Sequence, residues 1–249
     1  MQAQRFPMRR CAIIAGTFLI TLVLTAPAGP QSSIVLNTAN DPPNSTDEHT
    51  GLCDLILTEA FKRLGMTVKI VNLPSERALI NANEGIDDGN FARVEGLDKT
   101  YPNLIRVPVA ITKFEFTVFS KNPSLAIKNW ESLSPYNVGI ITGWKILEQN
   151  IVGTRSLAKV ADESLLFNLL QANRVDLVVY DRMQGKALMK RVRMRGIHVL
   201  DPPLAERNMY LYLHKRHAVL ADKLTKTLRG MEQDGTYKKI SHDVLNAFL

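Results

Sequence analysis

The sequence predicts an α/β protein whose chain builds two lobes. The 249 residues are 45% hydrophobic and 22% charged, a balance typical of globular proteins and enough for one large domain or two lobes of roughly 100 residues each. From Ser33 onward, short β-branched runs alternate with amphipathic stretches. Two such series follow one another, and alternation of this kind is typical of sheets flanked by helices.

The first series contains two strands and two helices. Its first amphipathic stretch has Leu52, Leu55, Ile56 and Ala60 on one face, as a helix requires, and stops at a glycine suited to a left-handed cap. The expected elements are a strand at 33–38, a helix at 51–64, a strand at 67–73, a helix at 74–84, and a loop at 87–93.

The second series begins with a longer strand that alternates apolar and polar residues. The run 175–180 is almost entirely apolar, which is typical of a parallel strand covered on both faces. In such sheets, ligands bind beyond the carboxyl ends of the strands. The expected elements are strands at 113–120, 137–141, 175–180 and 209–213, and helices at 143–149, 162–172, 219–231 and 237–248.

The N-terminus predicts export. Arg5, Arg9 and Arg10 precede an uncharged run, which ends in Ala26-Pro27-Ala28, small residues at the two positions that a signal peptidase inspects. We therefore interpret residues 1–28 as a cleaved signal peptide; an uncleaved anchor is the alternative. Removing three arginines lowers the net charge from +7 to +4, so nucleic acid is not the expected partner.

The remaining reactive side chains indicate no cofactor and no metal site. Cys11 leaves with the signal peptide, so Cys53 is alone and is expected to be a buried, inert thiol. His214 and His217 lack a third ligand at a recognisable spacing. The basic run from Lys186 to Arg195 is expected to be a solvated face.

Several segments, in this order, carry a resemblance to a known family. They are Asp41-Pro42-Pro43, the helix from Gly51 to Leu64-Gly65, Ser75-Glu76-Arg77-Ala78-Leu79, Gly85-Ile86-Asp87-Asp88-Gly89 with Arg93, Val138 to Gly143, Val175 to Asp181, and Met231 to Tyr237. The chain resembles the bacterial periplasmic solute-binding proteins of family 3, the amino-acid-binding type of ABC transporters. The resemblance implies a two-lobed, periplasmic-binding-protein-like type II (flytrap) fold with two crossing hinge strands. It places lobe 1 at 33–112 plus 205–249, lobe 2 at 113–204, and the hinge near 112–118 and 197–203.

The resemblance also implies a charge clamp. Arg93 matches the family arginine that holds the substrate carboxylate, and a guanidinium fork suits a carboxylate. Asp181 matches the aspartate that holds the α-amino group. The alternatives are a surface ion pair of Arg93 with Glu95 or Asp98, and a helix N-cap role for Asp181.

Other residues complete the expected ligand set. The turn Thr142-Gly143-Trp144 offers free backbone amides at a helix start, which attract an anion. Trp144 either stacks on the solute or packs beneath the helix, and Lys145 is expected to be solvated. The remaining candidates are Glu76, Arg77, Asn90 and Tyr180.

We therefore expect a monomeric, non-enzymatic periplasmic protein that captures a small polar solute, an amino acid or related carboxylate, by hinge closure for an ABC permease of the inner membrane. Two alternatives stay open. One is an exported cyclohexadienyl (arogenate or prephenate) dehydratase that uses Glu76 or Asp181. The other is a ligand-reporting protein that serves a sensor.

Overall fold

The computed structural model describes residues 1–3, 32–39 and 41–248. The chain divides into two units, Met1–Pro30 and Gln31–Leu249, and the helices and strands of the described residues belong to the second. The predicted signal peptide lies outside the described residues, apart from its first three. No helix in the described part of the chain has the length and apolar character needed to cross a membrane.

The first sheet holds the N-terminal strands. Strands β1 (Ser33–Thr38), β2 (Thr67–Asn72) and β3 (Gly89–Arg93) are parallel, with β1 in the middle. Strand β10 (Ala205–His214) returns antiparallel to β3, and β4 (Leu104–Arg106) also pairs with β10. The carboxyl ends of β1 and β3 therefore point to the same edge of this sheet.

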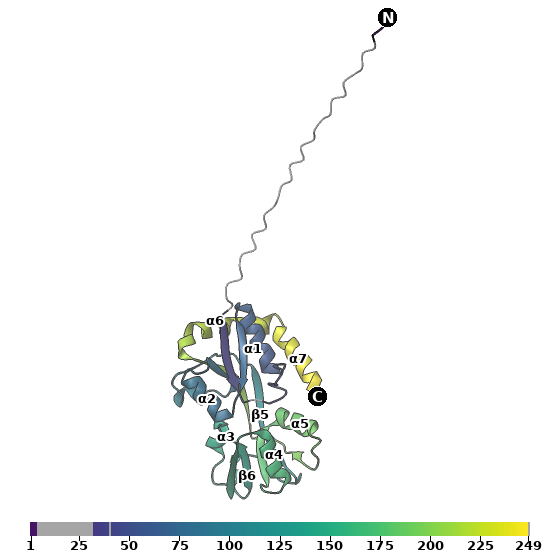
Figure 1. Ribbon diagram of the computed structural model, residues 1–249. Coiled ribbons are helices and arrows are strands. Elements are labelled where there is room, and N and C mark those ends of the chain that lie inside the picture. Colours follow the sequence, from purple (N-terminus) through teal and green to yellow (C-terminus); the bar gives the residue numbers. More distant parts are fainter. Residues whose placement is uncertain (4–31, 40, 249) are drawn as a thin grey trace. The chain divides into compact units, whose positions relative to one another are not determined.

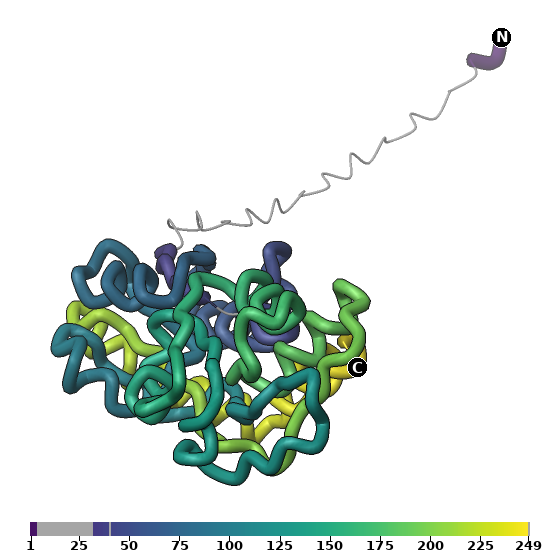
Figure 2. The backbone as a smooth tube through the Cα atoms, turned by 90° about the horizontal axis from the view of Figure 1, so that it is seen from below, coloured from purple at the N-terminus to yellow at the C-terminus, as the bar shows by residue number. Residues whose placement is uncertain are grey.

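Four helices cover the first sheet. They are α1 (Leu52–Arg63), α2 (Ser75–Asn83), α6 (Ala218–Gln233) and α7 (Thr236–Phe248). Helix α1 contacts both α6 and α7, so the two ends of the folded chain pack together (Figures 1 and 2). We call these helices, β1–β4 and the carboxyl end of β10 the first half.

The second half contains the middle of the chain. Its strands are β5 (Thr112–Ser120), β6 (Asn137–Ile141), β7 (Ser156–Val160), β8 (Leu177–Asp181) and β9 (His198–Val199). The sheet runs β10-β5-β8-β6-β7, with β6 parallel to β7 and β8, and β5 antiparallel to β8 and β9. Its helices are α3 (Lys145–Asn150), α4 (Glu163–Gln171) and α5 (Arg182–Arg191).

Strands β5 and β10 connect the halves. Residues 205–209 of β10 pair with β5, whereas residues further along β10 pair with β3 and β4 (Figure 1). One strand thus belongs to both sheets, and the two form a continuous mixed sheet. The predicted fold class, an α/β type II fold with crossing strands, is confirmed.

Most of the predicted elements are present, but the prediction of a loop at 87–93 is wrong. Residues 89–93 form β3, in which every residue is buried, including the polar Asn90 and Arg93. Polar side chains in a buried strand hide the apolar pattern on which strand prediction depends. The sequence also missed β4 and β7, which are short or half-exposed. The second crossing strand was predicted near 197–203, where only the short β9 forms, whereas the strand shared by both sheets is β10.

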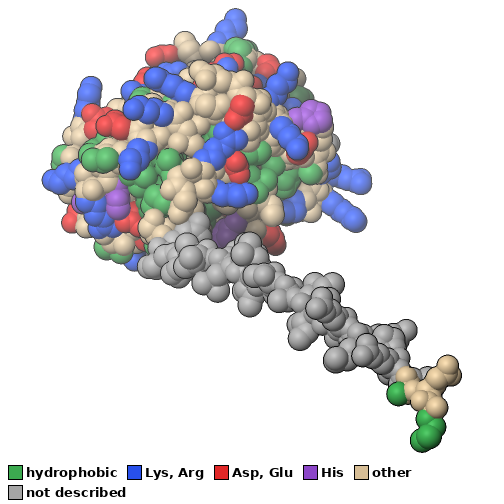
Figure 3. Space-filling view, turned by 90° about the horizontal axis from the view of Figure 1, so that it is seen from above, with side chains coloured by type: hydrophobic (Ala, Val, Ile, Leu, Met, Phe, Trp, Pro, Cys, Tyr) green, Lys and Arg blue, Asp and Glu red, His purple; other side chains and the backbone are tan. Residues whose placement is uncertain are grey.

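The surface carries charges of both signs. Figure 3 shows Lys and Arg side chains spread among acidic ones on one face rather than gathered in a single patch. Most of the basic residues from Lys186 to Arg195 are exposed, and Arg191 forms an ion pair with Glu163. The predicted solvated face is confirmed. The predicted burial of Cys53 is also confirmed, and this burial raises the pKa of its thiol.

Candidate ligand-binding site

A bulge at the end of β3 positions Arg93. Ala92 has a φ of +56°, in the left-handed region that non-glycine residues seldom adopt. The pairing register with β10 shifts between Tyr210 and Tyr212, opposite this point. Such bulges re-aim side chains, and here the guanidinium lies beneath α2 rather than in solvent.

Neutral groups hold the Arg93 guanidinium. One terminal nitrogen donates to Ser75 Oγ at 2.7 Å and the other to the Ser75 carbonyl at 2.9 Å, while Nε donates to Asn90 Oδ1. Asn90 is fixed in turn because its side-chain nitrogen donates to Asn37 Oδ1 at 2.7 Å. The predicted ligand residue Asn90 therefore acts as a support of Arg93.

Arg93 is a buried cation without a counter-ion among the described residues. It is 6% exposed, and no carboxylate of the described residues lies within salt-bridge distance. Its expected surface partner Glu95 binds Arg106 instead, at 2.8 Å. Burial lowers the pKa of Arg93 to about 10, against the raising influence of Tyr101 and Glu76, so the group stays charged at neutral pH. An anion that reached this group would relieve an unbalanced buried charge.

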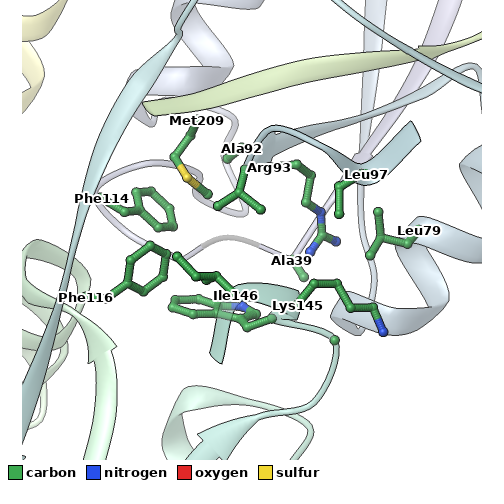
Figure 4. A pocket seen from close by; sticks show the side chains of 13 residues that line it. Ala39, Leu79, Ala92, Arg93, Leu97, Phe114, Phe116, Lys145, Ile146 and Met209 are labelled. Carbon is green, nitrogen blue, oxygen red and sulfur yellow. The ribbon is translucent and has the colours of Figure 1, made fainter. Parts of the chain in front are cut away.

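Arg93 lines a cavity between the two halves (Figure 4). The first half contributes Ala39, Leu79, Ala92, Arg93, Val94 and Leu97, and the second half contributes Phe114, Phe116, Gly143, Trp144, Lys145 and Ile146. Met209 comes from the part of β10 that pairs with β5. The cavity leaves about 30 Å³ for the centres of water molecules, room for about two. A larger solute requires its walls to move apart.

Lys145 connects the two halves beside this cavity. Its Nζ lies 2.5 Å from Glu76 Oε2 on α2 and 3.1 Å from Glu148 Oε2 on its own helix. Glu76 also accepts a hydrogen bond of 3.0 Å from the Tyr101 hydroxyl. The expectation that Lys145 is solvated is wrong, because helix α3 points it at the first half.

The amides of the turn at 142–144 are not free. The Thr142 amide donates to the Val160 carbonyl, that of Gly143 to Glu148 Oε1 at 3.1 Å, and that of Trp144 to the Ile141 carbonyl. The amides predicted to be free at 142–144 are therefore engaged, by strand pairing, by the turn itself and by the Glu148 side chain, whereas a contact of this turn with the solute stays a prediction. Thr142 does not line the cavity, whereas Gly143 and Trp144 do.

Gly143 lets the halves approach closely. Its φ is +84°, and a Cβ placed on it would lie 2.6 Å from the Glu76 backbone nitrogen in the first half. We expect Gly143→Ala to keep the halves apart and to lower solute affinity about tenfold or more, as measured by calorimetry. Gly153→Ala is the matched control, because Gly153 has a φ of +67° but nothing within 4 Å of a Cβ. Equal affinities of the two variants would contradict the account.

Trp144 packs within the protein. Its ring stacks on Tyr180 with a centroid distance of 4.7 Å and an interplanar angle of 14°, and it lies 5.9 Å from both Phe114 and Phe116. Of the two alternatives for Trp144, the structure supports packing, with the remaining surface of the ring on the cavity. Arg77, by contrast, is exposed and does not line the cavity.

Asp181 does not face Arg93. It is 1% exposed and caps helix α5: one carboxylate oxygen accepts from the Gln184 amide and the other from the Glu115 amide, both at 3.0 Å. Burial raises its pKa to about 7, although the backbone amides of Gln184 and Glu115 lower it. Asp181 lines a separate groove with Lys113 and Phe248. The predicted clamp of Arg93 and Asp181 is therefore corrected, because the cap of α5 takes one carboxylate oxygen and the Glu115 amide of β5 takes the other.

The cap role of Asp181 has a measurable consequence. Asp181→Ala removes the acceptor of the buried Gln184 amide and of the half-buried Glu115 amide, so we expect the free energy of unfolding to fall by about 2–4 kcal/mol. Asp162→Ala, which removes an exposed cap of α4, should cost only about 1 kcal/mol. Chemical denaturation checks both values. Unchanged stability of Asp181→Ala, together with lost solute binding, would restore the ligand role.

A second contact between the halves escaped the sequence analysis. The Tyr180 hydroxyl donates to Asp41 Oδ2 at 2.6 Å, which joins β8 to the segment after β1. Burial raises the pKa of Asp41 to about 7, and the nearby Glu163 carboxyl adds to the shift. Asp41, Tyr180 and Glu163 line an adjoining cavity that shares Ala39 and Trp144 with the first. The sequence singled out Tyr180 as a candidate ligand residue and the turn Asp41-Pro42-Pro43 as a motif, but not the hydrogen bond between them.

The two candidate acids of the dehydratase alternative are both engaged elsewhere. Glu76 binds Lys145 and Tyr101, and Asp181 caps its helix. Neither carboxyl stands beside Arg93 with a free oxygen aimed at the cavity. The geometry gives this alternative no support.

Comparisons with known proteins agree with this fold. No family model matches the chain. An uncharacterized protein of Shewanella oneidensis is 26% identical over 217 residues, which cover 84% of this chain and 80% of that protein. The substrate-binding protein of an amino acid ABC transporter superimposes with a TM-score of 0.70 at 17% identity, covering 84% of this chain and 97% of the other. A histidine kinase sensor domain with similarity to periplasmic binding proteins gives 0.75 at 16% identity, covering 86% and 97%. The chain therefore has the type II periplasmic-binding-protein fold, and the resemblance to amino-acid-binding proteins seen in its sequence is confirmed at the level of the fold.

Proposed function

We propose that the protein binds a small solute that carries a carboxylate, of the amino-acid or related type, and closes two lobes around it. The observation that carries the proposal is Arg93, a buried cation that lines a cavity between the halves and has no counter-ion among the described residues. The lobes would comprise residues 33–112 plus 205–249 and residues 113–204. The structural neighbours support the proposal because they include a substrate-binding protein of this fold.

The lobes would close because the solute binds the closed form more tightly than the open form. In an open form the solute carboxylate would reach the Arg93 fork; in the closed form Glu76 meets Lys145, and Asp41 meets Tyr180. A ligand shifts the equilibrium only if it prefers the closed form. Neutralising a buried charge, which is most desolvated when the cleft is shut, supplies that preference.

The proposed partner is an ABC-type permease of the inner membrane that recognises the closed form. The proposal includes a periplasmic location after removal of the signal peptide, a monomer, no cofactor, and no enzymatic activity. The likeness to a histidine kinase sensor domain favours a second candidate, a protein that reports its solute to a sensor. Binding of the closed form to a purified permease rather than to a sensor kinase distinguishes the two.

A thermal-shift screen of amino acids and small organic acids tests the proposal. A solute at 100 times its Kd stabilises the folded protein by about 2.7 kcal/mol, which corresponds to a rise in Tm of about 5–10 °C for a chain of this size. We expect such a rise with at least one carboxylate, confirmed by calorimetry. The absence of any shift with every carboxylate at millimolar concentration would contradict the proposed function.

A further inference from the structure

The charged side chains that line the cavity determine which charges a bound solute can carry. Of the residues that line it, only Arg93 and Lys145 are charged. Lys145 is already neutralised by Glu76 at 2.5 Å and Glu148 at 3.1 Å, whereas Arg93 has only neutral partners. The three hydrogen bonds of Arg93 leave two of its five N–H groups, one on each terminal nitrogen, without a partner among the described residues. The cavity therefore offers one positive charge, which matches one carboxylate.

The cavity has no acidic group for a cationic substituent. No Asp or Glu belongs to its lining. The adjoining cavity has three acids, and each has a partner: Asp41 accepts from the Tyr180 hydroxyl and lies against Glu163, Glu163 pairs with Arg191, and Asp162 caps α4. A second charge on the solute, of either sign, would lose its hydration at Arg93's cavity without gaining a partner.

The other walls are apolar. Phe114 and Phe116 lie 6.0 Å apart, and each lies 5.9 Å from the Trp144 ring. Ile146 faces this group from α3 and Met209 from β10, so aromatic and aliphatic side chains surround the space next to the guanidinium (Figure 4). Such walls favour a solute with a large apolar area, because each methylene group that is buried against them raises the affinity about fourfold.

We propose that the solute is a monocarboxylate with a compact apolar or aromatic body and no second charged group. The carboxylate pairs with Arg93, and the body contacts Phe116, Trp144, Ile146 and Met209. This inference rests on the proposed function and narrows its solute class, because a carboxylate-binding cavity with polar walls would have suited polar amino acids.

Calorimetry with two sets of probes tests the inference. The apolar set is phenylacetate, 3-phenylpropionate and 4-methylpentanoate; the polar set is L-glutamine, L-glutamate and L-arginine. L-Phenylalanine, which adds an ammonium group to 3-phenylpropionate, isolates the effect of a second charge. We expect the tightest apolar probe to bind at least tenfold more tightly than every polar probe, and 3-phenylpropionate more tightly than L-phenylalanine.

A matched pair of variants tests the contact itself. Met209→Gln places an amide in the cavity at nearly constant volume and should lower the affinity for phenylacetate at least tenfold. Met194→Gln is the same change at a half-buried methionine that does not line the cavity and should leave that affinity unchanged. If Met209→Gln does not fold, Ile146→Thr provides the same test from α3.

The outcomes separate the two proposals. If polar amino acids bind as tightly as the apolar probes or more tightly, or if Met209→Gln and Ile146→Thr leave phenylacetate affinity unchanged, the apolar class is overturned and the carboxylate-binding function remains. If no carboxylate of either set binds, both proposals are overturned.

Discussion

Replacement of Arg93 by methionine is expected to lower the affinity for the bound carboxylate at least thirtyfold. Truncating one partner of a buried, hydrogen-bonded charge pair costs about 2–5 kcal/mol, which corresponds to factors from about thirty to several thousand. Folding should survive, because Arg93 has no counter-ion among the described residues and a methionine of similar length removes a buried charge. Calorimetry gives the affinity, and urea denaturation gives the free energy of unfolding.

Arg93→Lys provides the control for geometry. Lysine keeps the charge but lacks the planar fork that contacts Ser75 and Asn90, so the affinity should fall about tenfold while a weaker carboxylate interaction persists. An affinity of Arg93→Met equal to that of the unmodified protein would show that the solute does not use this arginine.

Solute affinity is expected to decrease about tenfold between pH 5.5 and pH 7.5. Burial raises the pKa of Asp41 from 3.8 to about 7 in the described form, and Glu163 on α4 raises it further, whereas the Tyr180 hydroxyl and the more distant Arg191 lower it. Because Tyr180 and Glu163 belong to the opposite half, opening of the cleft would return the Asp41 pKa towards its usual value. The closed form then binds the proton more tightly than the open form. Protonation of Asp41 therefore favours closure most below pH 4. This contribution decreases as the pH rises towards 7, and above pH 7 it no longer changes.

Asp41→Asn tests the origin of this pH dependence. The amide can still accept the Tyr180 hydrogen bond but carries no charge, so the affinity should vary little from pH 5.5 to 7.5. Calorimetry over this range with a solute whose own charge is constant checks the prediction. Retention of the full pH dependence in Asp41→Asn would assign it to another group.

The regular elements were predictable because their patterns are local. The helix after Gly51 has a clear apolar stripe, and β8 is apolar up to its last residue, Asp181, so the local apolar pattern alone identified both. Strand β3 was not predictable in this way. Its residues Asn90 and Arg93 are polar and buried, since they belong to a hydrogen-bonded network with Asn37 and Ser75 that only the fold assembles.

The site was predictable in part, for a similar reason. The resemblance identified Arg93, and the structure places it in a cavity between the halves. It also suggested Asp181, but a side chain at a strand end can point towards the ligand or towards the following helix. Here the Asp181 carboxylate accepts from the Gln184 amide as a cap of α5 and from the Glu115 amide. The cross-connections of Glu76 with Lys145 and of Asp41 with Tyr180 join residues more than 60 positions apart, and no sequence spacing reveals such pairs.

A crystal structure of the protein with its tightest-binding carboxylate tests the central claim most directly. We predict that both carboxylate oxygens lie within hydrogen-bond distance of the two terminal nitrogens of Arg93, with the rest of the solute against Trp144 and Met209. Density for the solute in the groove beside Asp181, with Arg93 still bound only by Ser75 and Asn90, would contradict the account.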